Sequence, residues 1–218
     1  PPGPWMRFTH AIGFGDVNGD GRNDILVKDA WWEQPASLEG DPLWKKHAVA
    51  FAPGKGGAQM YAYDINGDGR NDVITSRDAH GYGLSWFEQM RGADGAISFR
   101  EHPILSTKAE EKINGLQFSQ LHAIELVDVD GDGIKDIVTG KRWWAHGPKG
   151  DAEPNADPVI YAFLVRREPN GGARFEPHLI DHASGVGVQL VMADANGDGR
   201  PDIVSANKRG TFVFLSEK

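Results

Sequence analysis

Four acidic nine-residue segments carry the clearest chemistry in this sequence. They share the pattern D-x-[DN]-G-D-G-x-x-D and read DVNGDGRND, DINGDGRND, DVDGDGIKD and DANGDGRPD, beginning at Asp16, Asp64, Asp128 and Asp194. Side-chain oxygens at positions 1, 3, 5 and 9, with the backbone carbonyl of position 7, can surround a hard cation such as Ca²⁺. Glycine at position 6 permits the sharp turn that this arrangement needs.

The number of copies decides between a metal site and an ordinary turn. A single copy would fit a metal-free turn equally well, because Asn, Asp and Gly favour turns. Four copies with one ligand pattern favour calcium, about four ions with one in each segment. An EF-hand is excluded, because position 12 is Val, Thr, Thr and Ser rather than Glu. The predicted ligands are Asp16, Asn18, Asp20, Arg22 and Asp24; Asp64, Asn66, Asp68, Arg70 and Asp72; Asp128, Asp130, Asp132, Ile134 and Asp136; and Asp194, Asn196, Asp198, Arg200 and Asp202.

Strand-like runs must position these segments. The apolar stretches AIGFG, MYAY, AIELV and QLVMA precede them, and the β-branched runs DILV, DVIT, DIVT and DIVS follow them. Each acidic segment is therefore predicted to be the turn of a β-hairpin. A third strand follows each hairpin (AWWEQ, GLSWFEQ, VIYAFLVRR, GTFVFLS), and a fourth follows the first three (PLWKKHAVA, ISFREHPIL, ARFEPHLI).

Hairpins with such loops, recurring every 48 to 66 residues, resemble the FG-GAP/VCBS repeats of integrin-α-like proteins. The resemblance implies an all-β fold, a β-propeller of four-stranded antiparallel blades in one domain spanning residues 1–218. Four blades are visible, at about 9–50, 57–105, 120–181 and 186–218. The last blade lacks a fourth strand, which the segment around Trp5 is expected to supply. Because such rings more often have seven blades, a fragment of a larger ring and a ring completed by a partner chain both stay open.

The face opposite the acidic segments, called the top face, is the predicted ligand site. Antiparallel connectivity brings there the turns between the second and third strands and the links from one blade to the next, including the long connections at residues 106–120 and 140–158. Polar, cationic and indole side chains gather on it, as on many binding surfaces. The predicted ligand-binding residues are Gln59, His80, Lys141, Trp143, Trp144, Gln189 and Arg209. Three histidines that recur once per repeat, His47, His102 and His178, are expected to be structural.

Composition limits the partners. The 218 residues include 31 acidic and 23 basic residues and no cysteine, which excludes disulfides, thiolate metal sites and a cysteine nucleophile. The acid excess argues against a nucleic-acid partner, and no apolar stretch is long enough to span a membrane. Thirteen acids lie in the four segments, which leaves 18 against 23 bases elsewhere, so an acidic ligand is admissible on the top face. Weak calcium sites favour a secreted, periplasmic or cell-surface location.

Two functions stay open. In the first, the chain is a calcium-stabilised binding module whose top face recognises a carbohydrate or a protein. In the second it is an enzyme, because the acidic loops and WWEQ-type strands also resemble the propeller part of aldos-2-ulose dehydratase. That resemblance implies β-elimination on a keto-sugar, with a second type of metal on the top face. The predicted catalytic residues are His10, His122, Arg142 and His146.

Overall fold

The computed structural model describes residues 9–217, and this range contains β-strands and no helix. The strands form four successive antiparallel units, called meanders 1 to 4. Meander 1 contains β1 (Ile12–Gly15), β2 (Asp24–Val27), β3 (Ala30–Glu33) and β4 (Lys45–Ala48). Meander 2 contains β5 (Met60–Tyr63), β6 (Asp72–Ser76), β7 (Leu84–Arg91) and β8 (Ile97–Leu105). Meander 3 contains β9 (Ile124–Val127), β10 (Asp136–Gly140), β11 (Ile160–Arg167) and β12 (Ala173–Asp181). Meander 4 contains β13 (Leu190–Ala193), β14 (Asp202–Asn207) and β15 (Gly210–Phe214).

Meanders 1 and 2 join into one sheet of eight strands, in the order β4-β3-β2-β1-β5-β6-β7-β8. The junction is a parallel pairing of the two inner strands, Gly13 with Met60 and Phe14 with Tyr61. A side chain at residue 13 would place its Cβ 2.0 Å from the carbonyl oxygen of Met60, so only glycine fits there. Separate four-stranded blades were expected, and this pairing corrects that expectation for the first two.

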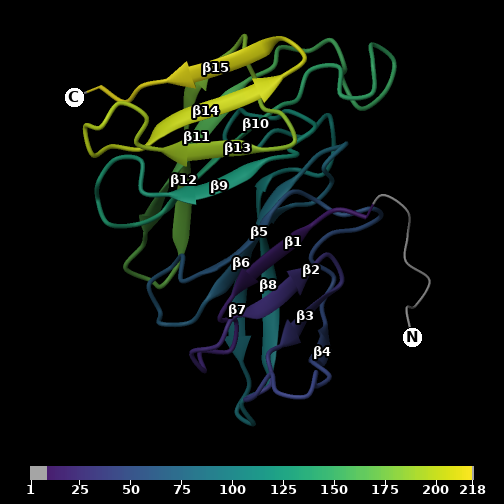
Figure 1. Cartoon of the computed structure of the whole chain (residues 1–218), viewed down its shortest axis with the longest axis vertical. Helices are drawn as coiled ribbons and strands as arrows, with labels where there is room; N and C mark the ends of the chain where they lie inside the picture. Colours follow the sequence, from purple (N-terminus) through teal and green to yellow (C-terminus); the bar gives the residue numbers. More distant parts are fainter. Residues whose placement is uncertain (1–8, 218) are drawn as a thin grey trace.

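Each junction between successive meanders has its own hydrophobic core. The buried strand faces of neighbouring meanders supply these cores, so the curled sheets pack side by side rather than around one central core (Figure 1). The all-β, repeat-by-repeat packing is propeller-like. From the first junction to the third, the cores include Trp31 and Phe87, Trp86 and Phe163, and Val138 and Leu190.

Recurring histidines on the outer strands belong to this packing. The ring of His47 stacks on Trp31 with 3.9 Å between centroids, and its Nε2 lies 2.7 Å from a carboxylate oxygen of Glu33. Trp86 and His102 form the same stack in meander 2. In meander 3 the equivalent histidine, His178, lies opposite Ala162 on the neighbouring strand, so it has no indole to stack on there. Two of the three histidines therefore have a visible structural role, and the third lacks the indole partner.

Meander 4 is a sheet of three strands, and the expected fourth strand around Trp5 lies outside the described residues. Apolar side chains on its strands are exposed, among them Val191 at 50 % and Val213 at 54 %. Phe14 on β1 is similarly exposed, at 63 %. The first and last meanders therefore each present apolar surface that none of residues 9–217 covers.

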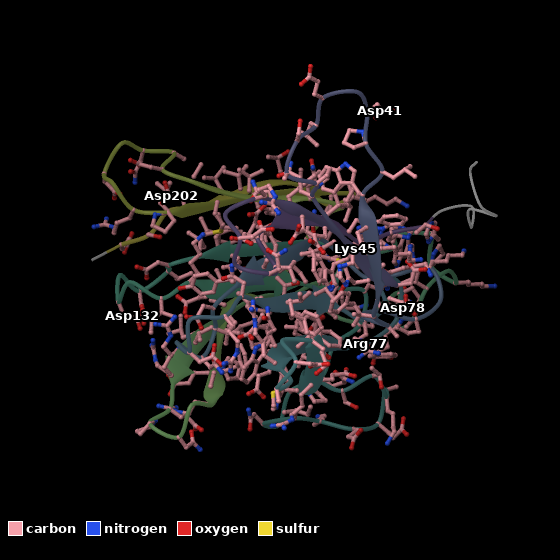
Figure 2. All side chains as sticks on the ribbon, turned by 90° about the horizontal axis from the view of Figure 1, so that it is seen from below. Asp41, Lys45, Arg77, Asp78, Asp132 and Asp202 are labelled. Atoms are coloured by element: carbon pink, nitrogen blue, oxygen red, sulfur yellow. The ribbon has the colours of Figure 1, made fainter. Side chains whose placement is uncertain are left out.

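The four acidic turns lie at one end of the meanders. Each connects the first two strands of its meander, and the ninth residue of each segment begins the second strand. Figure 2 shows Asp132 and Asp202, from the third and fourth turns, on one side of the molecule, with Arg77 and Asp78 on the other. Arg77 and Asp78 belong to the β6–β7 connection, so the opposite end is the top face predicted from connectivity.

Candidate functional site

The first residue of each acidic turn organises the loop backbone. In the first turn, Asp16 accepts hydrogen bonds from the amides of Gly19, Asp20 and Gly21 at 2.7–3.0 Å. Gly19 and Gly21 have φ values of 78° and 83°, a region that favours glycine. The second and fourth turns repeat these bonds. The carboxylate of the first residue therefore holds the loop backbone, a role that the sequence did not predict, since the pattern assigns this residue to calcium.

The ninth residue of each turn has a distinct environment. Its carboxylate is fully buried and accepts two backbone N–H groups, one from the second residue of the turn and one from the end of the third strand. For Asp72 the donors are Ile65 at 3.2 Å and Gln89 at 2.8 Å. Burial raises the pKa of Asp72 to about 6. The same pair of bonds forms at Asp24, Asp136 and Asp202.

An arginine guanidinium lies on the acidic cluster of every turn. Three turns have Arg at position 7, and this side chain pairs with the Asp at position 5: Arg22 with Asp20, Arg70 with Asp68 and Arg200 with Asp198. The third turn has Ile134 there, and Arg166 of β11 takes over, with 2.6 Å to Asp130 and 2.8 Å to Asp132. The sequence predicted only a backbone carbonyl at position 7, so this pairing was missed. In the third turn, Asp128, Asp130 and Asp136 bring oxygens within 4.8 Å of one another.

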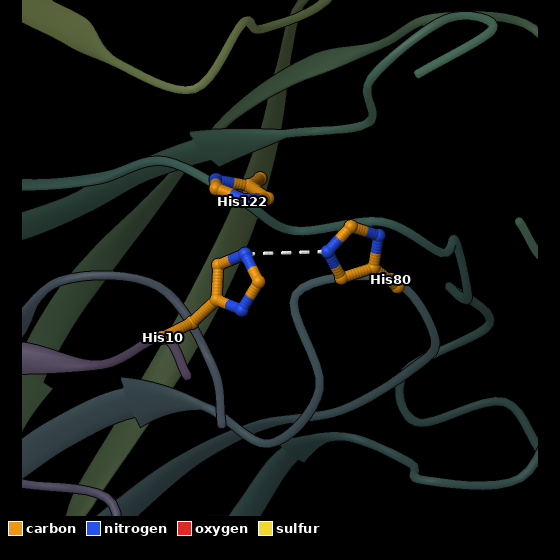
Figure 3. A group of neighbouring side chains, drawn as sticks. All are labelled: His10, His80 and His122. Carbon is orange, nitrogen blue, oxygen red and sulfur yellow. Dashed lines mark hydrogen bonds between the residues drawn. The ribbon is translucent and has the colours of Figure 1, made fainter. Parts of the chain in front are cut away.

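Three histidines meet on the top face. The ring centroids of His10, His80 and His122 are 4.8 to 5.4 Å apart, and the Nε2 atoms of His10 and His80 are separated by 3.3 Å. One nitrogen from each ring lies within 4.8 Å of the others (Figure 3). The three side chains line an open pocket of about 740 Å³.

Equivalent positions on two meanders supply two of these histidines. His10 and His122 each stand two residues before an inner strand and six before an acidic turn. Meanders 2 and 4 have Ala58 and Val188 at this position. Beside these histidines, Ala11 and Gln120 have φ values of 69° and 61°, which non-glycine residues seldom adopt. Backbone strain of this kind often accompanies functional sites.

Burial keeps the ring of His122 neutral. It lowers the pKa of His122 to about 3, and the neighbouring charges of Arg142 and His10 act in the same direction. The Nδ1 atom of His122 is buried and has no hydrogen-bond partner among residues 9–217. A buried polar atom without a partner indicates a missing ligand or water.

A carboxylate from the long connection at residues 140–158 borders the cluster. Asp151 lies 3.1 Å from Nδ1 of His80 and 2.9 Å from Nδ1 of His146, whose ring stacks on that of His80. Arg142 is 3.0 Å from Nδ1 of His80 and 3.5 Å from Asp151. Burial alone would raise the pKa of Asp151, but hydrogen bonds from His146 and His80 lower it below its usual value. All four predicted catalytic residues therefore line one pocket, together with Asp151.

Of the seven predicted ligand-binding residues, His80 lines the pocket, three others lie beside it and three lie outside it. Trp143 and Trp144 stack at 4.3 Å beside the pocket, and Arg209 lies over Trp143. Gln59 faces meander 3, where it accepts the amide of Ile124 at 3.0 Å, so it is not a pocket residue.

The remaining two also lie outside the pocket. Lys141 is 1 % exposed, with Nζ 2.8 Å from Ser119, so it is a buried support rather than a surface cation. Gln189 is exposed and is not part of the pocket lining. Sequence reasoning missed Asp151, which lies in a stretch that reads as ordinary polar loop.

Comparison with known families decides what the repeat is. Residues 64–139 match the FG-GAP-like repeat family. The matched range contains the second acidic turn, the strands β6 to β9, and the third acidic turn with most of β10. This part of the chain is an FG-GAP-like repeat. No curated protein matches the chain. No helix in the described part of the chain is long and apolar enough to cross a membrane.

Proposed function

We propose that this chain is a calcium-stabilised FG-GAP β-propeller module whose top-face pocket binds a second type of metal and, beside it, a carbohydrate ligand. The meeting of His10, His80 and His122 carries the proposal. Three imidazoles from three separate segments are brought together, and two of them stand two residues before an inner strand, where meanders 2 and 4 have other residues.

The acidic turns support calcium binding. Each combines a preorganised loop with several carboxylates that repel one another without a cation, and oxygen ligands of this kind suit Ca²⁺. The guanidinium on each turn already partly neutralises that charge, so calcium would compete with it. Because cytosolic free calcium is low, this proposal places the protein in a secreted, periplasmic or cell-surface setting.

The histidine cluster suits a transition metal rather than calcium. Imidazole nitrogens are preferred by Zn²⁺, Cu²⁺, Fe²⁺ and Ni²⁺. Neutral rings are required for ligation, and burial keeps His122 neutral. His10, His80 and His122 would hold the ion, which would supply Lewis acidity at the pocket.

Indoles beside the pocket favour a carbohydrate as the ligand. Sugar rings pack against aromatic faces, and the Trp143–Trp144 stack offers such a face next to Arg142. Arg142 and Lys55 make the pocket suitable for an acidic sugar. A protein ligand is the alternative outcome of a binding screen.

A lyase acting on a keto-sugar is the second candidate, and His146 favours it. Its side chain is 60 % exposed at the pocket, and Asp151 contacts its Nδ1. Nε2 is then free to accept a proton from the carbon beside a ketone, while the leaving group departs from the next carbon. Arg142 is close enough to the pocket to stabilise negative charge on the ketone oxygen.

The proposal also includes completion of the propeller ring. Exposed apolar side chains on the first and last meanders, such as Phe14 and Val213, would be covered by further blades or by a partner chain. The three-stranded meander 4 would gain its outer strand in the same way.

Metal analysis of matched variants tests the main proposal. The protein would be loaded with calcium and zinc, dialysed and assayed for both metals, alongside His10→Ala and His122→Ala. We expect both variants to lose zinc and to keep calcium. His182→Ala is the matched control, because His182 is exposed and does not line the pocket. Equal zinc in wild type and both pocket variants would contradict the proposal.

A further inference from the structure

We propose that Asp151 is a positioning residue that fixes the tautomer of His80, so that Nδ1 carries the proton and Nε2 faces His10 and His122 with its lone pair. The consequence for metal binding rests on the proposed function. The orientation itself is a property of the metal-free chain and can be measured without any metal.

The contacts of His80 assign its two nitrogens to different tasks. Nδ1 lies 3.1 Å from Oδ1 of Asp151, whereas Nε2 points the other way, 3.3 Å from Nε2 of His10. An ionised carboxylate only accepts hydrogen bonds, so a proton on Nδ1 satisfies the contact with Asp151. Metal-binding histidines commonly donate their second N–H to a carboxylate in this way, which fixes the ring for ligation.

The other charged group near Nδ1 cannot replace Asp151. Nη2 of Arg142 lies 3.0 Å from Nδ1, but a guanidinium only donates. In the wild type the same Nη2 also lies 3.5 Å from Oδ2 of Asp151, so the guanidinium can donate to that carboxylate while Nδ1 of His80 keeps its proton. Without Asp151, Arg142 would donate to Nδ1 and the proton of His80 would move to Nε2, where it would block ligation. At the backbone, the amide of His80 donates to Asp78 at 2.9 Å.

A buried polar network holds Asp151 in place. The carbonyl of the next residue, Ala152, accepts from Gln120 Nε2 at 2.7 Å, Ser119 Oγ at 2.9 Å and Lys141 Nζ at 3.3 Å. All three donors are at most 1 % exposed. The amide of Ala152 in turn donates to the carbonyl of His80 at 3.4 Å.

This network explains why Lys141 can be buried despite its charge. Burying an ammonium group is unfavourable unless it is hydrogen-bonded, and the amine of Lys141 bonds the segment that carries Asp151. The connection at residues 140–158 is thus pinned immediately after the residue that contacts two histidines of the pocket. A merely solvated loop would need no such anchor.

Histidine tautomers in the metal-free protein test the proposal. With ¹⁵N-labelled histidine, long-range ¹H–¹⁵N correlation distinguishes the Nδ1–H from the Nε2–H form at neutral pH. We expect His80 to be Nδ1–H in the wild type and Nε2–H in Asp151→Ala. Asp151→Asn, which keeps one acceptor oxygen, should retain part of the Nδ1–H form. Asp157→Ala, an exposed aspartate of the same connection, is the control and should match the wild type.

The wild-type spectrum alone can overturn the proposal, even if a variant folds poorly. An Nε2–H form of His80 in the wild type would do so, and so would an unchanged tautomer in Asp151→Ala. Cobalt titration then separates this proposal from the proposed function. If both hold, Asp151→Ala should bind Co²⁺ about 10- to 100-fold more weakly and show an altered visible spectrum.

The mixed results have separate meanings. A tautomer change in Asp151→Ala without Co²⁺ binding by the wild type would support the positioning role and contradict the metal proposal. Co²⁺ binding that is equal in the wild type and Asp151→Ala, with the same tautomer in both, would support the metal proposal and contradict the positioning role.

Discussion

Arg167 on β11 donates a hydrogen bond from Nη2 to the main-chain carbonyl of Asp64, at 2.7 Å. Asp64 is the first residue of the second acidic turn, so a side chain of meander 3 holds a turn of meander 2. Nε of the same arginine reaches the carbonyl of Ile65 at 3.1 Å. Arg91 of meander 2 holds the first turn equivalently, through the carbonyl of Asn18. The acidic turns are therefore part of the contacts between meanders.

Removal of this arginine should weaken the junction between meanders 2 and 3. We expect Arg167→Ala to lower the free energy of unfolding by about 1 kcal/mol, because two carbonyls lose a charged donor at a partly exposed site. Urea denaturation measures the change. Arg174→Ala is the control, since Arg174 is exposed and pairs only with Glu176 of its own strand, and its effect should stay below about 0.5 kcal/mol. Equal effects of the two variants would contradict the bracing role.

Two aspartates of the fourth turn should respond differently to calcium. Asp202→Ala leaves two backbone N–H groups without their acceptor, so we expect a loss of about 3 kcal/mol in calcium and in EDTA alike. Asp198 is exposed, and Asp198→Ala should matter mainly when calcium is present. Thermal unfolding in both buffers separates the two roles. Identical behaviour of the two variants, or a wild-type melting curve that EDTA leaves unchanged, would count against calcium as the stabilising ligand.

The buried amine of Lys141 should make stability depend on alkaline pH. Burial lowers its pKa from 10.5 to about 8. Between these values the folded chain binds fewer protons at this site than the unfolded chain, so its contribution to the free energy of unfolding rises with pH. The rise amounts to about 3 kcal/mol across the window.

Lys141→Met should abolish this pH dependence. The measurement is urea denaturation at several pH values within the window, compared between the wild type and the variant. Lys149→Met serves as the exposed control and should retain the wild-type slope. A slope that survives in Lys141→Met would show that another group titrates.

Local patterns in the sequence predicted the hairpins well, because four copies of one turn fix both the loop and the strands beside it. Gln59 was wrongly predicted to be a pocket residue. Side chains alternate between the two faces of a strand, and this alternation explains the error. His10 and His122 stand six residues before their acidic turns, whereas Gln59 stands five before its own and so faces the other side. This distinction was available from the sequence.

Non-local contacts were beyond reach of the sequence. The pairing of β1 with β5 depends on the fit of Gly13 against Met60, which no local pattern reveals. Arg166 replaces the missing arginine of the third turn from a strand more than thirty residues away. Asp151 belongs to a polar stretch without periodicity, and only the donors around Ala152 show that it is anchored.

Anomalous diffraction at the zinc edge, from crystals grown with both calcium and zinc, would show where each metal binds. We expect a zinc peak bounded by the imidazoles of His10, His80 and His122, with calcium in the acidic turns. Zinc bound only at the acidic turns, with nothing between the three histidines, would contradict this expectation.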